Sequence, residues 1–184
     1  MKINTKEMVL TALFTALTVA GAKLNLMLPN IPVTLQTAIV MLAGCIGGKK
    51  VAFLSQVLYI VAGLIGIPVF AMPDAGPAYV LKPSFGYIIG FTAAAYIIGL
   101  IIEKSRKSII SFIAANMAGI AVIYFFGVIY IYLLMNLYMG KHINMLKAIS
   151  IGLAPFIIKD IIIAFVLSFI CRKIYFTLKN TVHD

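Results

Sequence analysis

The stretch from residue 109 to 138, IISFIAANMAGIAVIYFFGVIYIYLLMNLY, decides the fold class of this chain. It has no charged side chain and is longer than the about 20 residues with which an α-helix crosses a bilayer. A membrane β-barrel strand has only about 10 residues, which alternate between apolar and polar. The stretch therefore predicts a tilted or bent spanning helix whose tyrosines reach the membrane interface.

The composition of the whole chain agrees with this stretch. Of the 184 residues, 63% are hydrophobic and 11% are charged, whereas soluble domains have roughly 25% charged residues. Lipid must therefore cover most of the surface. We expect one all-α integral membrane domain over residues 1–184 with six transmembrane helices. Its predicted spans are about 8–28, 34–46, 51–67, 85–102, 108–134 and 146–171.

The first apolar run allows two interpretations. Lys2 and Lys6 precede it and the sequence Ala20-Gly21-Ala22 resembles a cleavage site, as in a signal peptide. The apolar residues, however, continue past that site to Leu28. A retained first helix is therefore the preferred interpretation.

The basic residues indicate the orientation of the chain. The net charge is +10, with 15 Lys and Arg against 5 Asp and Glu. Most of the cations lie in short clusters between apolar runs, as retention signals on the cytoplasmic side do. This placement predicts cytoplasmic termini in the cell (inner) membrane, and no nucleic-acid binding. The clustered cations are Lys2, Lys6, Lys49, Lys50, Lys104, Arg106, Lys107, Arg172, Lys173 and Lys179.

Enzyme chemistry finds little support in the sequence. The few acidic residues form no pair, and neither they nor the two histidines, His142 and His183, make a metal-ligand cluster. A glycine-rich P-loop is also missing. We therefore expect neither a catalytic site nor a metal site. Because the chain cannot hydrolyse ATP by the P-loop route, any energy that it uses would have to come from a partner or from a gradient.

Two adjacent charges, Lys159 and Asp160, lie inside the last apolar run. An unpaired charge at the bilayer centre costs about 3 kcal/mol, so such residues usually face a cavity or a partner. Alternatively, both lie near a helix end and the lysine reaches the interface. Adjacent helical residues point about 100° apart, so an ideal ion pair is not expected.

Other polar residues begin or interrupt predicted spans. They are Thr34, Gln36 and Thr37 in the second span and Asn116 and Tyr124 in the fifth. Such side chains can hydrogen-bond between helices. They can equally supply donors and acceptors to a ureido or amide ligand in a mostly apolar pocket.

Three alanines of the first span, Ala12, Ala16 and Ala20, are spaced by four residues. They form one stripe of small side chains on a helix, which suits close packing. The stripe serves either packing within the chain or docking of another membrane protein.

In several of its motifs the chain resembles a known family, the biotin-specific substrate-binding subunits (S components, BioY family) of energy-coupling-factor (ECF) transporters. The resemblance covers nearly the whole chain and rests on the order and spacing of several motifs. These are Ile31-Pro32-Val33-Thr34-Leu35-Gln36-Thr37 with Leu42-Ala43-Gly44, Tyr59 with residues 63–70, Pro83 with residues 86–91, Asn116 with Gly119, Tyr124 and Gly127, and Pro155-Phe156 with Asp160.

The resemblance implies a six-helix S component with an outward-facing biotin pocket, capped by the loops after helices one and three. It implies biotin as bound substrate without a cofactor. It also implies work with a transmembrane coupling protein and two ATPase subunits, toward which the alanine stripe would face.

The chain departs from the family pattern at two places. The family's last helix has a lysine three residues after the aspartate, where this chain has Ile163, and a lysine precedes the aspartate instead. The second departure is a lysine at residue 82, which begins the segment 82–87. Tyr87, the last residue of this segment, is a further ligand-binding candidate. The resemblance thus suggests that Asp160 accepts from the ureido N–H groups while Lys82 or Lys159 meets the valerate carboxylate. A different small vitamin, an enzyme or a scaffold are the alternatives.

Overall fold

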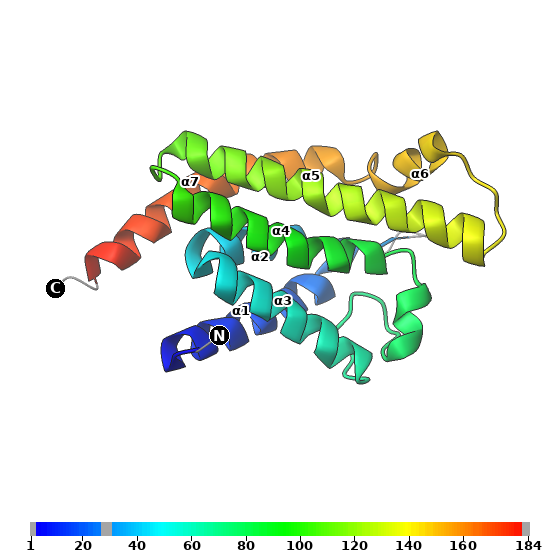
Figure 1. Ribbon diagram of the computed structural model, residues 1–184, viewed down its shortest axis with the longest axis horizontal. Coiled ribbons are helices and arrows are strands. Elements are labelled where there is room, and N and C mark those ends of the chain that lie inside the picture. The colour runs from blue at the N-terminus through cyan, green and yellow to red at the C-terminus, as the bar shows by residue number, and fades with distance from the viewer. Residues whose placement is uncertain (1–2, 27–30, 182–184) are drawn as a thin grey trace.

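The computed structural model describes residues 3–26 and 31–181, and these are largely helical (Figure 1). Two short strands, two π-helical turns (η1 and η3) and one 3-10 helical turn (η2) accompany the α-helices. In chain order the elements are α1 Thr5–Lys23, β1 Asn25–Leu26, β2 Val33–Thr34, α2 Gln36–Leu42, η1 Ala43–Gly47, α3 Gly48–Leu64, η2 Pro77–Leu81, α4 Phe85–Lys104, α5 Ile109–Leu133, η3 Leu134–Tyr138, α6 Met145–Gly152 and α7 Ile157–Thr181.

Four helical stretches among the described residues are long and apolar enough to cross a membrane. They are Gln36–Leu64, Phe85–Lys104, Ile109–Tyr138 and Ile157–Leu178. Helix α4 is the central one, because it packs against α3 on one side and α5 on the other (Figure 1). Its buried side chains therefore form the middle of the core.

The first of these stretches is a hairpin, whose turn lies between the predicted spans 34–46 and 51–67. The chain reverses direction between α2 and α3 (Figure 1). Gly48 makes the reversal with φ of +74°, a backbone conformation that suits glycine because it has no Cβ. The hairpin places the start of α2 beside the end of α1, where Leu35 N donates to Gly21 O.

Helix α1 ends earlier than the predicted span 8–28. Lys23 is its last residue, and Asn25 then pairs with Thr34 in a two-stranded antiparallel ribbon. The Asn25 amide donates to Ala22 O at 2.7 Å and to Ala71 O at 3.3 Å, so its side chain ends the helix and holds the following loop. Residues 27–30 lie outside the described part.

The predicted span 146–171 is two helices in the structure, α6 and α7, separated by residues 153–156. Pro155 explains the break, because proline has no N–H to donate and its ring clashes with the carbonyl four residues earlier. Lys159 and Asp160 therefore lie in the first turn of α7. Both residues thus lie near a helix end, which was one of the two sequence-based interpretations. Asp160 is nevertheless buried.

Candidate functional site

One cavity gathers most of the polar residues that the sequence singles out. It lies between the β2–α2 segment, the α3–α4 loop, and helices α4, α5 and α7, with about 490 Å³ of space between its lining atoms. Part of this space is open to solvent. The lining residues are Ile31, Pro32, Thr34, Gln36, Thr37, Ala71, Tyr79, Ser84, Tyr87, Ile88, Phe91, Ile123, Tyr124, Phe156, Lys159 and Asp160.

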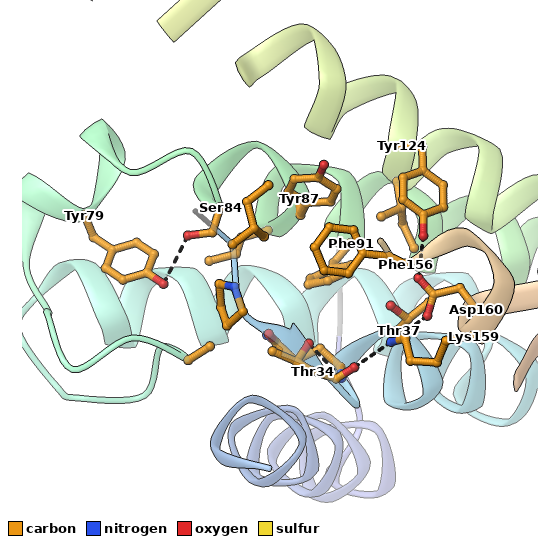
Figure 2. Close-up of a pocket in the computed structure, with 16 residues that line it drawn as sticks. Thr34, Thr37, Tyr79, Ser84, Tyr87, Phe91, Tyr124, Phe156, Lys159 and Asp160 are labelled. Carbon is orange, nitrogen blue, oxygen red and sulfur yellow. Dashed lines mark hydrogen bonds and ion pairs between the residues drawn. The ribbon is translucent and has the colours of Figure 1, made fainter. Parts of the chain in front are cut away.

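The Asp160 carboxylate is the cavity's buried charge. Asp160 is only 4% exposed. Its Oδ2 accepts a hydrogen bond from the Tyr124 hydroxyl at 2.7 Å (Figure 2). Its Oδ1 is buried, and among the described residues its partner is the Lys159 ammonium. The first turn of a helix also favours a negative charge, because unpaired backbone N–H groups point toward it.

Lys159 supplies the counter-charge. Its Nζ lies 2.8 Å from Asp160 Oδ1 as an ion pair and donates to the backbone carbonyl of Thr34 at 2.8 Å. An ion pair between these adjacent helical residues was not expected from the sequence, yet it forms. The long lysine side chain bends toward β2, which brings its ammonium group beside the Asp160 carboxylate. One cation therefore joins α7 to the β2–α2 segment.

Two aromatic side chains, Tyr87 and Tyr124, form a wall beside the carboxylate. Their rings meet edge to face with centroids 6.3 Å apart. The Tyr87 hydroxyl donates to Gly152 O at 2.6 Å, which fixes the ring. Gly127 leaves room for it, since a Cβ at this position would lie 2.4 Å from the Tyr87 ring.

The β2–α2 segment contributes Thr34 and Gln36. Thr34 Oγ1 accepts from the Gln36 backbone N–H at 3.3 Å, and Gln36 Nε2 donates to the Tyr59 hydroxyl at 3.0 Å. Gln36 is 3% exposed. Its amide is thus oriented by Tyr59 of α3, which leaves its carbonyl oxygen as an acceptor near the cavity.

The cavity has a second polar end, the Ser84 end, formed by Tyr79 and Ser84. Figure 2 shows these residues on one side and Tyr124, Lys159 and Asp160 on the other, with Tyr87 and Phe91 between them. Ser84 Oγ donates to the Tyr79 hydroxyl at 3.4 Å. Burial raises the pKa of Tyr79 above its usual value, so this phenol stays neutral at physiological pH. The cavity is therefore charged at the Asp160 end and neutral at the Ser84 end.

Two of the predicted ligand-binding residues do not line this cavity. Lys82 lies in the α3–α4 loop, where its Nζ forms an exposed ion pair with Asp74 at 2.8 Å. Asn116 is fully buried on α5 and bonds to other helices, accepting from Cys45 Sγ at 3.4 Å and donating to Ser168 Oγ at 3.0 Å. Asn116 thus has the helix-joining environment that the sequence left as an alternative.

Thr37, a polar residue noted in the sequence, also lines the cavity, whereas three further lining residues were not singled out as binding candidates. Tyr79, Ser84 and Phe91 come from the loop and from one face of α4. Their types are common in ordinary cores, so only the packing of the α3–α4 loop over α4 distinguishes them. Among the described residues, no three His, Cys, Asp or Glu side chains come together as metal ligands do.

The alanine stripe lies apart from the cavity. Ala12, Ala16 and Ala20 are all exposed on α1. The other side of α1 packs on α3, where Gln56 Nε2 donates to Thr18 Oγ1 at 3.0 Å. The stripe is therefore not used for packing within the described chain.

Comparison with known proteins identifies the family of this architecture. The model of the BioY family matches residues 1–180. The chain belongs to the BioY family. A probable biotin transporter BioY of Lysinibacillus sphaericus is 37% identical over 94% of this chain and 88% of its own length. The biotin transporter BioY of Thermotoga maritima is 36% identical over 85% and 88%.

A solved structure of the same kind confirms the fold. The crystal structure of an S-component for biotin from an ECF-type ABC transporter superposes with a TM-score of 0.78. It is 25% identical and covers 94% of both chains. The predicted S-component-like helical membrane fold is thereby confirmed, and the chain is a multi-pass membrane protein of a transporter family.

Proposed function

We propose that this protein captures biotin and brings it into the cell as the substrate-binding subunit of an ECF-type transporter. One observation carries the proposal: a buried carboxylate, Asp160, lies at one end of a largely apolar cavity in a BioY-family chain. Biotin has two ureido N–H donors, an apolar bicyclic ring and chain, and a terminal carboxylate. A cavity with an acceptor at one end and apolar walls suits such a molecule.

The two cavity ends suggest how the ligand is oriented. In our proposal the ureido N–H groups donate to Asp160, whose Oδ1 has the Lys159 ammonium as its partner in the described chain and keeps a further lone pair for the ligand. The bicyclic ring then packs against Tyr87 and Phe91. The valerate carboxylate, at the far end of the molecule, comes to Tyr79 and Ser84 (Figure 2), where the Tyr79 hydroxyl accepts from Ser84 and can donate to the carboxylate.

This orientation distinguishes the two candidate cations. Lys159 pairs with Asp160 at one end of the cavity. Lys82, two residues before Ser84, belongs to the loop that forms the other end. Of the two lysines, Lys82 is therefore the proposed long-range partner of the ligand carboxylate.

The same proposal assigns partners and orientation in the membrane. A transmembrane coupling protein and two ATPase subunits supply the energy, and the exposed stripe of Ala12, Ala16 and Ala20 is the proposed docking face. The start of α1 and the end of α7 lie toward one end of the bundle (Figure 1), in keeping with both termini in the cytoplasm and residence in the cell membrane.

Binding of labelled biotin to the purified protein tests the substrate. We expect saturable binding that unlabelled biotin displaces and riboflavin and thiamine do not. A folded, monodisperse sample that binds no biotin would overturn the proposal. Displacement by one of the other two vitamins would instead assign the cavity to a different substrate.

Uptake into cells that carry the coupling protein and ATPases tests the docking face. Ala16→Trp places a large side chain in the stripe, so we expect normal biotin binding and strongly reduced uptake. Ala114→Trp, the same exchange at an exposed alanine of α5, is the matched control. Equal uptake by wild type and Ala16→Trp would remove the stripe from the proposal.

A further inference from the structure

Lys159 occupies an unusual place for a cation in a ligand cavity. Its ammonium group already has two partners in the protein, Asp160 Oδ1 and the Thr34 carbonyl oxygen, each at 2.8 Å. A lysine ammonium has three N–H donors in all. Two of the three are therefore directed to the protein.

The Asp160 carboxylate depends on this cation. A buried charge without a counter-charge is strongly unfavourable, because the lost hydration is not replaced. One helical turn further along α7, on the same side of the helix, Ile163 is apolar and packs against the core. Among the described residues, Lys159 is the cation that pairs with Asp160.

A ligand carboxylate at Lys159 would create a second problem. Because Lys159 Nζ lies beside Asp160 Oδ1, an anion bound to the same ammonium would approach the Asp160 carboxylate closely. Two carboxylates that share a site repel each other and oppose joint ionisation. The geometry therefore disfavours Lys159 as the group that receives an acidic ligand's carboxylate.

The hydrogen bond to Thr34 connects Lys159 of α7 to another segment of the chain. Thr34 belongs to β2, and its Oγ1 accepts from Gln36 N at the start of α2. Thr34, Gln36 and Asp160 all line the cavity. The Lys159 side chain thus fixes two cavity walls relative to each other.

We propose that Lys159 is a positioning residue, which neutralises Asp160 and ties β2 to α7 without binding the carboxylate of the ligand. The inference rests on the proposed biotin function. It makes Lys159 act through Asp160, and that dependence is measurable.

Comparison of a charged and a neutral ligand tests the role. Biotin and biotin amide share the ureido ring and differ in the carboxylate. We expect Lys159→Met to weaken both ligands by the same factor, about tenfold or more, as for a buried pair that loses one partner. Lys159→Arg should recover part of the loss. Loss of biotin affinity with retained biotin amide affinity would overturn the inference, and so would unchanged affinity for both.

A double-mutant cycle tests the dependence on Asp160. If Lys159 acts through Asp160, the variants Asp160→Asn and Asp160→Asn/Lys159→Met should bind biotin amide equally weakly. Additive losses would contradict this. Lys147→Met, which removes an exposed lysine of α6, is the matched control and should behave like wild type.

Thermal stability separates this inference from the proposed function, because it needs no ligand. Lys159→Met leaves a buried unpaired carboxylate, whereas the double variant leaves none. We expect the single variant to melt below the double variant, even if wild type binds no biotin. Equal melting temperatures would count against neutralisation of Asp160 by Lys159.

Discussion

Two lysine–aspartate pairs of this protein have the same N–O distance and opposite environments. Lys159–Asp160 and Lys82–Asp74 both measure 2.8 Å. The Asp160 side chain is 5% exposed and that of Asp74 is 51% exposed, while the two lysines differ little, at 29% for Lys159 and 38% for Lys82. An exposed pair contributes about 0–1 kcal/mol to stability, while breaking a buried pair costs about 3–5 kcal/mol. Burial of the carboxylate, and not the N–O distance, therefore decides how much free energy is lost when each pair is broken.

The largest expected difference follows from removing each carboxylate in turn. Asp160→Asn removes the proposed ureido acceptor and leaves Lys159 without its counter-charge, so we expect biotin affinity to fall by about 2–4 kcal/mol. Asp74→Asn, the matched exposed change, should leave affinity within a factor of about 2. Isothermal titration of both variants checks this. Equal effects would show that burial does not separate the pairs.

A smaller effect is expected from the hydrogen bond to Asp160 Oδ2. Tyr124→Phe removes the hydroxyl donor and keeps the ring. We expect the free energy of biotin binding to weaken by about 1.5–3 kcal/mol, the usual value for a hydrogen bond to a charged group. Tyr96→Phe, at a partly exposed site on α4, is the control and should bind as wild type does. A Tyr124→Phe protein with full affinity would mean that Asp160 does not need this donor.

Lys82→Ala tests the exposed pair of the comparison, Lys82–Asp74. Loss of the Lys82–Asp74 pair should lower the free energy of unfolding by less than about 1 kcal/mol. We expect biotin affinity to fall only a few-fold and biotin amide affinity to stay constant, because Lys82 acts on the ligand charge from outside the cavity lining. A loss above tenfold for biotin would place the ammonium in direct contact with the ligand.

The smallest expected effect concerns pH at the Ser84 end. Burial raises the pKa of Tyr79, so the folded state favours the neutral phenol. As pH rises through about 10, the tyrosine ionises in the unfolded state, where it is exposed, before it ionises in the folded state. Ionisation stabilises the unfolded state, so the free energy of unfolding falls. Tyr79→Phe should therefore show a shallower alkaline decline in melting temperature than wild type. Identical slopes would contradict the buried state of this hydroxyl.

The sequence predicted the helices better than their ends. Long apolar runs between basic clusters are enough to define spans, because lipid accepts no unpaired backbone and the helix satisfies its own. Ends depend on contacts that local sequence does not show. Asn25 ends α1 by bonding to Ala71, 46 residues away. Pro155 was visible in the sequence, yet the apolar run around it concealed the break between α6 and α7.

Most of the candidate residues that interrupt apolar sequence lie together in the structure. Thr34, Gln36, Tyr124, Lys159 and Asp160 all line the cavity. Asn116 has the same appearance in sequence and bonds within the bundle instead, since the face of α5 that each residue occupies decides its partner. Tyr79, Ser84 and Phe91 gave no comparable signal, because hydroxyl and aromatic side chains are ordinary in cores.

By itself, the sequence determined that this is a helical membrane protein, and its motifs indicated the BioY family. Those properties follow from hydropathy and charge order, which are local and need no contacts. Only the tertiary structure decided that Lys159 turns toward Thr34 and Asp160 and that Lys82 remains with Asp74. Which partner a lysine reaches depends on how separate segments pack around it, and adjacent helical positions alone disfavour the pair that forms.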